Sequence, residues 1–285
     1  MLMIIAVLIV FGLCLGSFAN ALVWRVHQQA EESKKKKPSK KRLQELSISK
    51  GRSMCPDCGH ELSAKDLVPV LSWLSTKGKC RYCQKKISVQ YPVVEVATAI
   101  LFVASYVWWP YQLSADGWQL IAFGLWLAIL TGLMALLIYD LRWYLLPNRI
   151  VYPLTVLAGC MALIQVSVAP EPASAVIDTA LSVLVGGGIF YALFQLSGGK
   201  WIGGGDVKLG WLLGLVIASW AGSLLMIFIA ALLGSLVSIP LILDKKLKRT
   251  SVIPFGPFLI AGAIIVVLFG ADIIDWYTQL IDIGA

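Results

Sequence analysis

The sequence contains little charge and almost no histidine. Only 14% of its 285 residues are Asp, Glu, Lys or Arg and two are histidine, whereas 58% are hydrophobic. A soluble domain cannot bury so much apolar surface, so this composition and the mean hydropathy of +0.79 exclude an ordinary globular protein. Uncharged runs long enough to cross a hydrocarbon layer of about 30 Å recur along the chain. The predicted fold class is an all-α polytopic membrane protein.

The first hydrophobic run lacks the features of a removable signal peptide. No basic residue precedes it and no small-residue cleavage site follows it, so we predict a retained first helix. About eight transmembrane helices are predicted, at residues 1–24, 92–109, 118–139, 150–169, 176–196, 205–220, 221–243 and 252–271. The uncharged stretch 209–243 is too long for one crossing, so residues 219–223 must form a tight turn.

These spans divide the chain into four parts. They are a first transmembrane helix (1–24), a cytoplasmic loop (25–91), a transmembrane core (92–271) and a short extracytoplasmic tail (272–285).

Charge placement agrees with this count. Most of the 24 Lys and Arg residues lie in residues 25–86, and with eight spans all the others fall on the same side. The opposite side carries only the acids Asp116, Glu171, Asp178, Asp272, Asp275 and Asp282. The positive-inside rule then predicts that the basic side is cytoplasmic and that both termini lie outside.

The basic cluster Lys34–Lys37, with Lys40, Lys41 and Arg42, permits two interpretations. It is typical of a topology signal that contacts anionic lipid headgroups. Nucleic acid is the alternative, but no aromatic platform or groove-reading helix accompanies the cluster. We therefore expect membrane lipids as a partner and no nucleic acid.

Four cysteines in the loop have the spacing of a metal site. Cys55 with Cys58 and Cys80 with Cys83 form two C-x-x-C pairs, which together supply four thiolates for one tetrahedral ion. The pattern predicts structural zinc, because four thiolates leave no position for a reacting water. A redox role is the alternative, although it needs only one pair. Cys14 and Cys160 lie in apolar spans and are expected to be buried.

Two aspartates at the ends of spans are the candidate catalytic residues. Asp140 ends the third predicted span and Asp206 begins the sixth, so two crossings return both to the cytoplasmic boundary. The helix dipole favours negative charge at Asp206 and disfavours it at Asp140. If the carboxyl groups meet, they can share one proton, with Asp206 the more readily ionised, and hydrolyse a peptide as aspartic proteases do. Helix capping is the alternative role for either residue.

The residues around Asp206 suggest a substrate-binding loop. Gly203, Gly204 and Gly205 leave the backbone free to adopt any φ and allow a peptide to approach, although they also suit a simple hinge. Lys208 either orients Asp206 or marks the membrane interface.

Together these residues resemble the prepilin leader peptidases and N-methyltransferases of type IV pilus and type II secretion systems. The G-x-G-D signature of that family matches residues 203–206, and its first aspartate, followed by a proline, matches Asp140 with Pro147. The segments "GSFANALVWR", "QYPVVE" and "IPFGPF" and the two cysteine pairs follow in the family's order.

The resemblance implies a bacterial inner-membrane enzyme that acts on prepilins or pseudopilins. It would remove a short basic leader at the cytoplasmic face and then methylate the new amine with S-adenosylmethionine. Glu95, Glu61 and Asp66 are predicted to contact the basic leader, although Glu95 equally suits the start of a helix. Methyl transfer rests on the resemblance alone, because no glycine-rich nucleotide-binding turn is present.

Two other functions stay open. One is a peptidase of the same G-x-G-D kind without methyl transfer, which the cysteine loop disfavours. The other is a zinc-bearing transporter or scaffold, which leaves the glycines before Asp206 unexplained.

Overall fold

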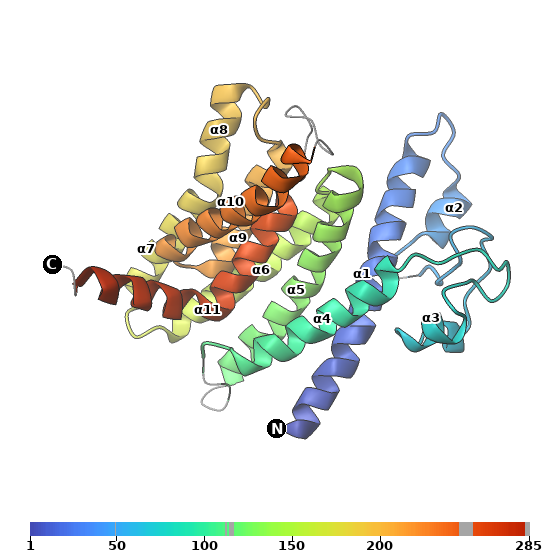
Figure 1. Ribbon diagram of the computed structural model, residues 1–285, viewed down its shortest axis with the longest axis horizontal. Helices are drawn as coiled ribbons and strands as arrows, with labels where there is room; N and C mark the ends of the chain where they lie inside the picture. Colours follow the sequence, from blue (N-terminus) through green and yellow to red (C-terminus); the bar gives the residue numbers. More distant parts are fainter. Residues whose placement is uncertain (49, 112, 114–116, 245–252, 283–285) are drawn as a thin grey trace. The chain divides into compact units, whose positions relative to one another are not determined.

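The computed structural model describes residues 1–285 except 49, 112, 114–116, 245–252 and 283–285, and it is built of helices (Figure 1). The elements are α1 (Leu2–Ser33), α2 (Lys40–Glu45), η1 (Ala64–Asp66), α3 (Leu71–Ser75), α4 (Gln90–Val107), α5 (Gly117–Trp143), α6 (Asn148–Val168), α7 (Pro172–Val183), η2 (Leu184–Gly188), α8 (Ile189–Ser197), α9 (Gly204–Ile217), α10 (Trp220–Leu243) and α11 (Gly256–Asp282). No strand forms within the described residues, where the only pairings are two isolated bridges. The predicted all-α class is confirmed. Asp116 and the basic residues of 245–249 lie outside the described residues.

Seven helices in the described part of the chain are long and apolar enough to cross a membrane. They are α1, α4, α5, α6, the continuous run Pro172–Ser197, α10 and α11. The sixth of the eight predicted spans, 205–220, is present as α9 but has only 14 residues. At 1.5 Å per residue it is about 21 Å long, short of the ~30 Å of hydrocarbon. The expected tight turn lies at Ala218, in the left-handed conformation, and Ser219, which caps α10.

The first and last helices are longer than the sequence suggested. α1 continues past residue 24 to Ser33, and α11 continues past residue 271 to Asp282. The expectation that Cys14 and Cys160 are buried is wrong, because both are exposed on spanning helices. In a membrane the outer surface of a bundle faces lipid, so an apolar side chain gains nothing by turning inward.

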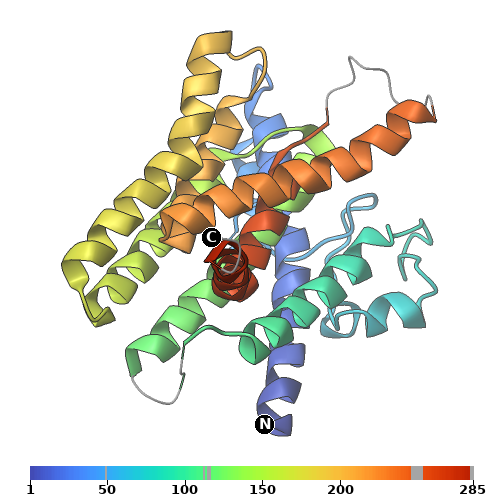
Figure 2. The same ribbon diagram turned by 60° about the vertical axis from the view of Figure 1, so that its left-hand side comes forward.

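The chain forms two compact units, one of Met1–Val107 with Leu130–Ile138 and the other of Trp108–Ile129 with Tyr139–Ala285. In the first unit, α1 and α4 pack closely as an antiparallel pair (Figures 1 and 2). A Cβ added at Gly12 would come within 2.5 Å of the Ala99 backbone, and one at Gly16 within 2.7 Å of Glu95 Cα. This small-xxx-small pattern allows the two backbones to touch.

In the second unit α9 lies at the centre, with Leu209, Leu212 and Leu213 fully buried. Its contact with the α7–η2 run is close, since a Cβ at Gly210 would overlap the carbonyl oxygen of Gly186. The Ser182 hydroxyl donates to the Gly214 carbonyl oxygen at 2.8 Å. Tight packing on several sides holds α9, and with it Asp206 in its first turn, in a fixed position.

Candidate active site and metal centre

Asp140 lies in the last turn of α5 with only 5% of its surface exposed. Its Oδ2 is buried and has no hydrogen-bond partner that meets full geometric criteria among the described residues. The backbone N–H of Gly256 approaches the carboxyl group, and a Cβ added at Gly256 would come within 2.5 Å of Oδ2. A buried carboxyl oxygen without a full partner is costly and is typical of a reactive site.

The approach of Gly256 changes the electrostatic expectation for Asp140. Gly256 is the first residue of α11, so the free N–H groups of a 27-residue helix begin beside the carboxyl group. These groups favour negative charge and offset the unfavourable C-terminal end of α5. The expected electrostatic contrast between the two aspartates is therefore smaller than the sequence indicated. Each aspartate has a helix N-terminus beside it.

Asp206 is in the first turn of α9, as expected, and is partly buried. The backbone N–H of Gly203, the N-cap residue, donates to its carboxylate. The charge of Asp206 acts on Asp140, and Leu209, one turn along α9, lies beside Gly256. The structure thus brings together the two aspartates that lie far apart in the sequence.

The glycines before Asp206 do not need unusual backbone angles. Gly203 has a φ of −76°, and the glycines with positive φ in the described chain are Gly59, Gly78, Gly198 and Gly199. Gly205 is tight for another reason, because a Cβ there would lie 3.3 Å from the Leu146 side chain. The close approach of Leu146 accounts for Gly205, whereas a Cβ at Gly203 or Gly204 would make only ordinary contacts. Their contact with a substrate backbone stays a prediction.

Lys208 reaches α6. Its Nζ donates to the Asn148 Oδ1 at 2.9 Å and lies 5.8 Å from the ring centre of Tyr152. Residues two apart on a helix point to different faces, so Lys208 is poorly placed to orient Asp206. The contacts join α9 to α6 and leave substrate binding by Lys208 a prediction.

The four loop cysteines converge. The Sγ atoms of Cys55, Cys58, Cys80 and Cys83 all lie within 4.8 Å of one another, and those of Cys55 and Cys83 are 3.9 Å apart. Tetrahedral zinc with Zn–S bonds of about 2.3 Å requires sulfur separations of about 3.8 Å. The donor set and its spacing fit zinc.

The two cysteine pairs form matching knuckles. The N–H of Cys55 donates to the His60 carbonyl oxygen and that of Cys80 to the Lys85 carbonyl oxygen, at 2.9 and 2.8 Å. Positive φ values follow the second cysteine of each pair, at Gly59 (+71°) and Gln84 (+58°). Gly78 also has a positive φ, but it precedes the second cysteine pair and lies against Trp73, so in the second knuckle Gln84 adopts the left-handed conformation. The only signal in the sequence for this conformation is that Gln84 directly follows the second C-x-x-C pair, as Gly59 follows the first.

The knuckle backbone also favours thiolates. Burial opposes ionisation of Cys80, but N–H groups of Cys83 and Tyr82 outweigh it and lower the pKa of Cys80 to about 7. Burial raises the pKa of Cys55. Because metal binding requires thiolates, a bound cation would remove the remaining protons.

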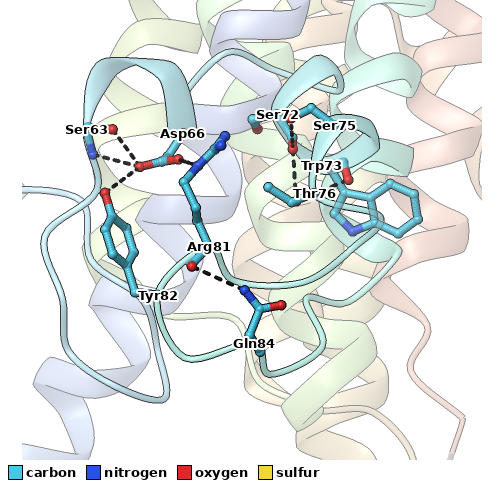
Figure 3. Close-up of polar contacts among 9 residues, drawn as sticks. All are labelled: Ser63, Asp66, Ser72, Trp73, Ser75, Thr76, Arg81, Tyr82 and Gln84. Carbon is cyan, nitrogen blue, oxygen red and sulfur yellow. Dashed lines mark hydrogen bonds and ion pairs between the residues drawn. The ribbon is translucent and has the colours of Figure 1, made fainter.

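Asp66 braces the loop from outside the cysteine cluster (Figure 3). Its carboxylate accepts from the Ser63 backbone and hydroxyl, from Arg81 Nε at 2.8 Å and from the Tyr82 hydroxyl at 3.0 Å. Burial opposes its charge, yet these donors hold its pKa well below the usual range. Glu61, the other loop acid considered for the leader, pairs with Arg52. Because Ser63, Arg81 and Tyr82 already donate to the carboxylate of Asp66, its contact with a leader peptide stays a prediction.

Two family models match the parts of the chain that contain the cysteine cluster and the two aspartates. The family model described as "Bacterial Peptidase A24 N-terminal domain" matches residues 10–109, and the one described as "Type IV leader peptidase family" matches residues 127–239. A protein of Aeromonas hydrophila named prepilin leader peptidase/N-methyltransferase is 33% identical over 282 residues, covering 94% of this chain and 91% of that protein. The chain belongs to the type IV leader peptidase family.

Other members of this family show the same extent of similarity. A Bacillus subtilis protein of the same name is 30% identical and covers 97% of this chain and 98% of its own. A type 4 prepilin-like proteins leader peptide-processing enzyme of Escherichia coli O78:H11 is 34% identical over 89% of both chains. No solved structure matches the chain. The first family model covers the four cysteines, the second covers both aspartates, and Gly256 lies beyond both.

Proposed function

We propose that the protein removes the basic leader from type IV prepilins or pseudopilins and then methylates the new N-terminus. The family and the names of its relatives support the substrate class and both reactions. The observation that carries the peptidase assignment is that the charge of Asp206 acts on Asp140, that each lies beside a helix N-terminus, and that one buried carboxyl oxygen of Asp140 has no full partner among the described residues.

The two carboxyl groups hydrolyse the peptide by sharing one proton. The ionised carboxylate takes a proton from water, whose oxygen attacks the scissile carbonyl carbon, while the protonated carboxyl group donates to the carbonyl oxygen. Collapse of the tetrahedral intermediate breaks the C–N bond, and a proton passes to the leaving amine. Because both aspartates face helix N-termini, we assign the shared proton to the pair rather than to Asp140 alone.

The cysteine cluster holds structural zinc in this proposal. Thiolates of Cys55, Cys58, Cys80 and Cys83 would fill its coordination sphere, so the ion folds the loop and activates no water. S-adenosylmethionine supplies the methyl group in the second reaction. We propose that the loop serves methyl transfer and that the two aspartates carry out cleavage.

The protein is a multi-pass membrane protein, and its orientation belongs to the proposal. The basic loops face the cytoplasm, both termini lie outside, and Asp140 and Asp206 lie at the cytoplasmic boundary of the inner membrane. Lipid headgroups contact the cluster at 34–42. The glycines 203–205 and Lys208 are proposed to contact the substrate. The carboxylate of Glu95 is buried and already accepts the backbone N–H of Val70, so we do not assign it to the leader.

Reconstitution with a synthetic prepilin tests both activities by substrate mass. Asp140→Asn and Asp206→Asn should each abolish loss of the leader, whereas Asp178→Asn, an exposed acid of α7, should cleave normally. Cleavage by both active-site variants would refute the assignment. With S-adenosylmethionine present, the cleaved product should gain one methyl mass. Cys55→Ser with Cys58→Ser should release zinc and stop this gain, and full methylation by that variant would refute the role of the loop.

A further inference from the structure

Polar side chains along α1 contact first α4 and then successive parts of the loop. In chain order the contacts are Ser17 with Glu95, Asn20 with Tyr91, Arg25 with Ser47, Ile48 and Gly51, Gln29 with Leu46, and Glu32 with Ser39. Arg25 is the first charged residue of α1 and follows an uncharged stretch of spanning length. It therefore marks the membrane boundary, and each contact on its N-terminal side lies at membrane depth.

Glu95 carries one loop segment to that depth. Its Oε2 accepts the backbone N–H of Val70 at 2.7 Å, and Glu95 is buried beside Ser17. Ser17 lies about 12 Å before Arg25 along α1, and Glu95 lies about 7.5 Å beyond the start of α4 at Gln90, at 1.5 Å per residue. α4 has 18 residues and needs its full length to span the membrane. Both helices therefore place Val70 several ångströms inside the hydrocarbon.

The residues around Val70 are apolar and face outward. Leu71 is 64% exposed and Leu74 57%, and Leu67 and Val68 are more than two-fifths exposed. Figure 1 shows α3 level with the middle of α1, whereas α2 lies nearer the C-terminal end of α1. Four exposed apolar side chains in a short soluble loop would be unfavourable, but acyl chains would cover them favourably.

The polar groups of this segment bond internally. The N–H groups of Ser72, Leu74 and Thr76 donate to backbone carbonyl oxygens, and the N–H of Val70 donates to Glu95. The hydroxyls of Ser75 and Thr76 turn back onto the Ser72 carbonyl oxygen, as Figure 3 shows. Such internal bonding is what hydrocarbon requires of any non-spanning backbone. It explains why a costly buried acid stands in α4, because Val70 would otherwise present an unpaired donor.

We propose that residues 67–74 form a re-entrant segment that dips into the bilayer and is covered by phospholipid. Acyl chains contact Leu67, Val68, Leu71 and Leu74. The exposed side chains of Lys65 and Lys77, at the two ends, reach phosphate headgroups. The loop thereby has a third anchor besides α1 and α4, and the hydrogen bonds of Asp66 and Glu95 hold it at a fixed height. This inference does not depend on the proposed function.

Photo-crosslinking in nanodiscs of phosphatidylethanolamine and phosphatidylglycerol tests the proposal. A benzophenone amino acid is placed at Leu71 or Leu74, and at Gln44 as the control. Gln44 is an exposed residue of α2, and Gln29 holds the end of α2 beyond Arg25. After irradiation, the Leu71 and Leu74 proteins should gain the mass of one phospholipid and the Gln44 protein should not. All three should bind one zinc ion per chain, which confirms a folded loop.

Two results would overturn the proposal. One is equal lipid adduct at Leu71, Leu74 and Gln44. The other is absence of lipid adduct at Leu71 and Leu74 with adduct to added prepilin instead, which would make this surface a peptide-docking site. Both readouts are independent of catalysis, so they remain valid even if the peptidase assignment fails.

Discussion

Gly256 is the residue whose role depends most on its missing side chain. It brings the first N–H of α11 to Asp140, and a methyl group there would overlap Oδ2. Gly256→Ala should therefore displace Asp140 without touching any residue proposed to bind the leader. Because a displacement of about 1 Å can cost on the order of 10²-fold in rate, we expect kcat to fall by about that factor with KM unchanged. Steady-state cleavage of a synthetic prepilin measures both constants.

A second glycine provides the matched control for this prediction. A Cβ added at Gly159, in α6, would meet no atom within 4 Å, so Gly159→Ala should keep the kcat of the original protein. Equal melting temperatures for the two variants would show that both fold. A Gly256→Ala protein with full kcat would show that the close approach does not position Asp140. An increase confined to KM would assign Gly256 to substrate binding instead.

Single residues of the site could be predicted only in part. Asp140 and Asp206 are identifiable because ionisable side chains are rare at the ends of spans. Gly256 is not, since it is one of 25 glycines and its partner lies far away in the sequence. The same holds for Asp66, whose partners Arg81 and Tyr82 meet it only once the cysteine pairs have folded.

At the scale of an element, the second cysteine knuckle, Cys80–Cys83, carries backbone strain that the first knuckle, Cys55–Cys58, avoids. Gln84 and Gly59 have the same place in the two turns and the same sign of φ, but only glycine adopts that conformation without cost. Gln84→Gly should relieve the strain and lose one exposed hydrogen bond to Arg81, for a net stabilisation of about 0.5 kcal/mol. Zinc should then leave to a chelator about twofold more slowly, as followed with a colorimetric indicator.

The reciprocal change tests the same explanation. Gly59→Gln meets open space, so only its backbone angle should matter, and it should destabilise the loop by about 1 kcal/mol and speed zinc loss. Equal rates of zinc loss in the two variants would show that the conformation of these turns does not control how fast zinc leaves. Slower zinc loss from Gly59→Gln than from the original protein would contradict the explanation by backbone strain.

Helices were predicted well where hydropathy alone decides and less well at their ends. α1 runs past residue 24 because Arg25, Gln29 and Glu32 bond the loop, and hydropathy cannot detect such contacts. α9 falls short of a crossing because its length is set by the turn at Ala218, which carries no marked sequence signal. If the unequal pair α9 and α10 together returns the chain to the side from which it came, the predicted distribution of charge between the two sides is kept.

At the scale of the whole molecule, the site depends on the number of crossings between its two aspartates. α6 and the run Pro172–Ser197 separate Asp140 from Asp206, and both are long enough to span. The sequence could predict that both carboxyl groups share a side, because parity needs only a count of spans. It could not predict that they meet, because that requires the packing of α9 and the arrival of α11 at Asp140.

The predicted number of crossings between the two aspartates can be tested by labelling two positions that flank the run Pro172–Ser197. Glu171 precedes α7 and Lys200 follows α8, and both are exposed. An impermeant maleimide added to intact spheroplasts should label Glu171→Cys at once and Lys200→Cys only after permeabilisation, because the proposed orientation puts the basic end of this run in the cytoplasm. The unsubstituted protein sets the background from its own cysteines. Equal labelling of both positions from outside would show that this run does not cross the membrane. The number of crossings would then no longer explain why Asp140 and Asp206 lie on the same side.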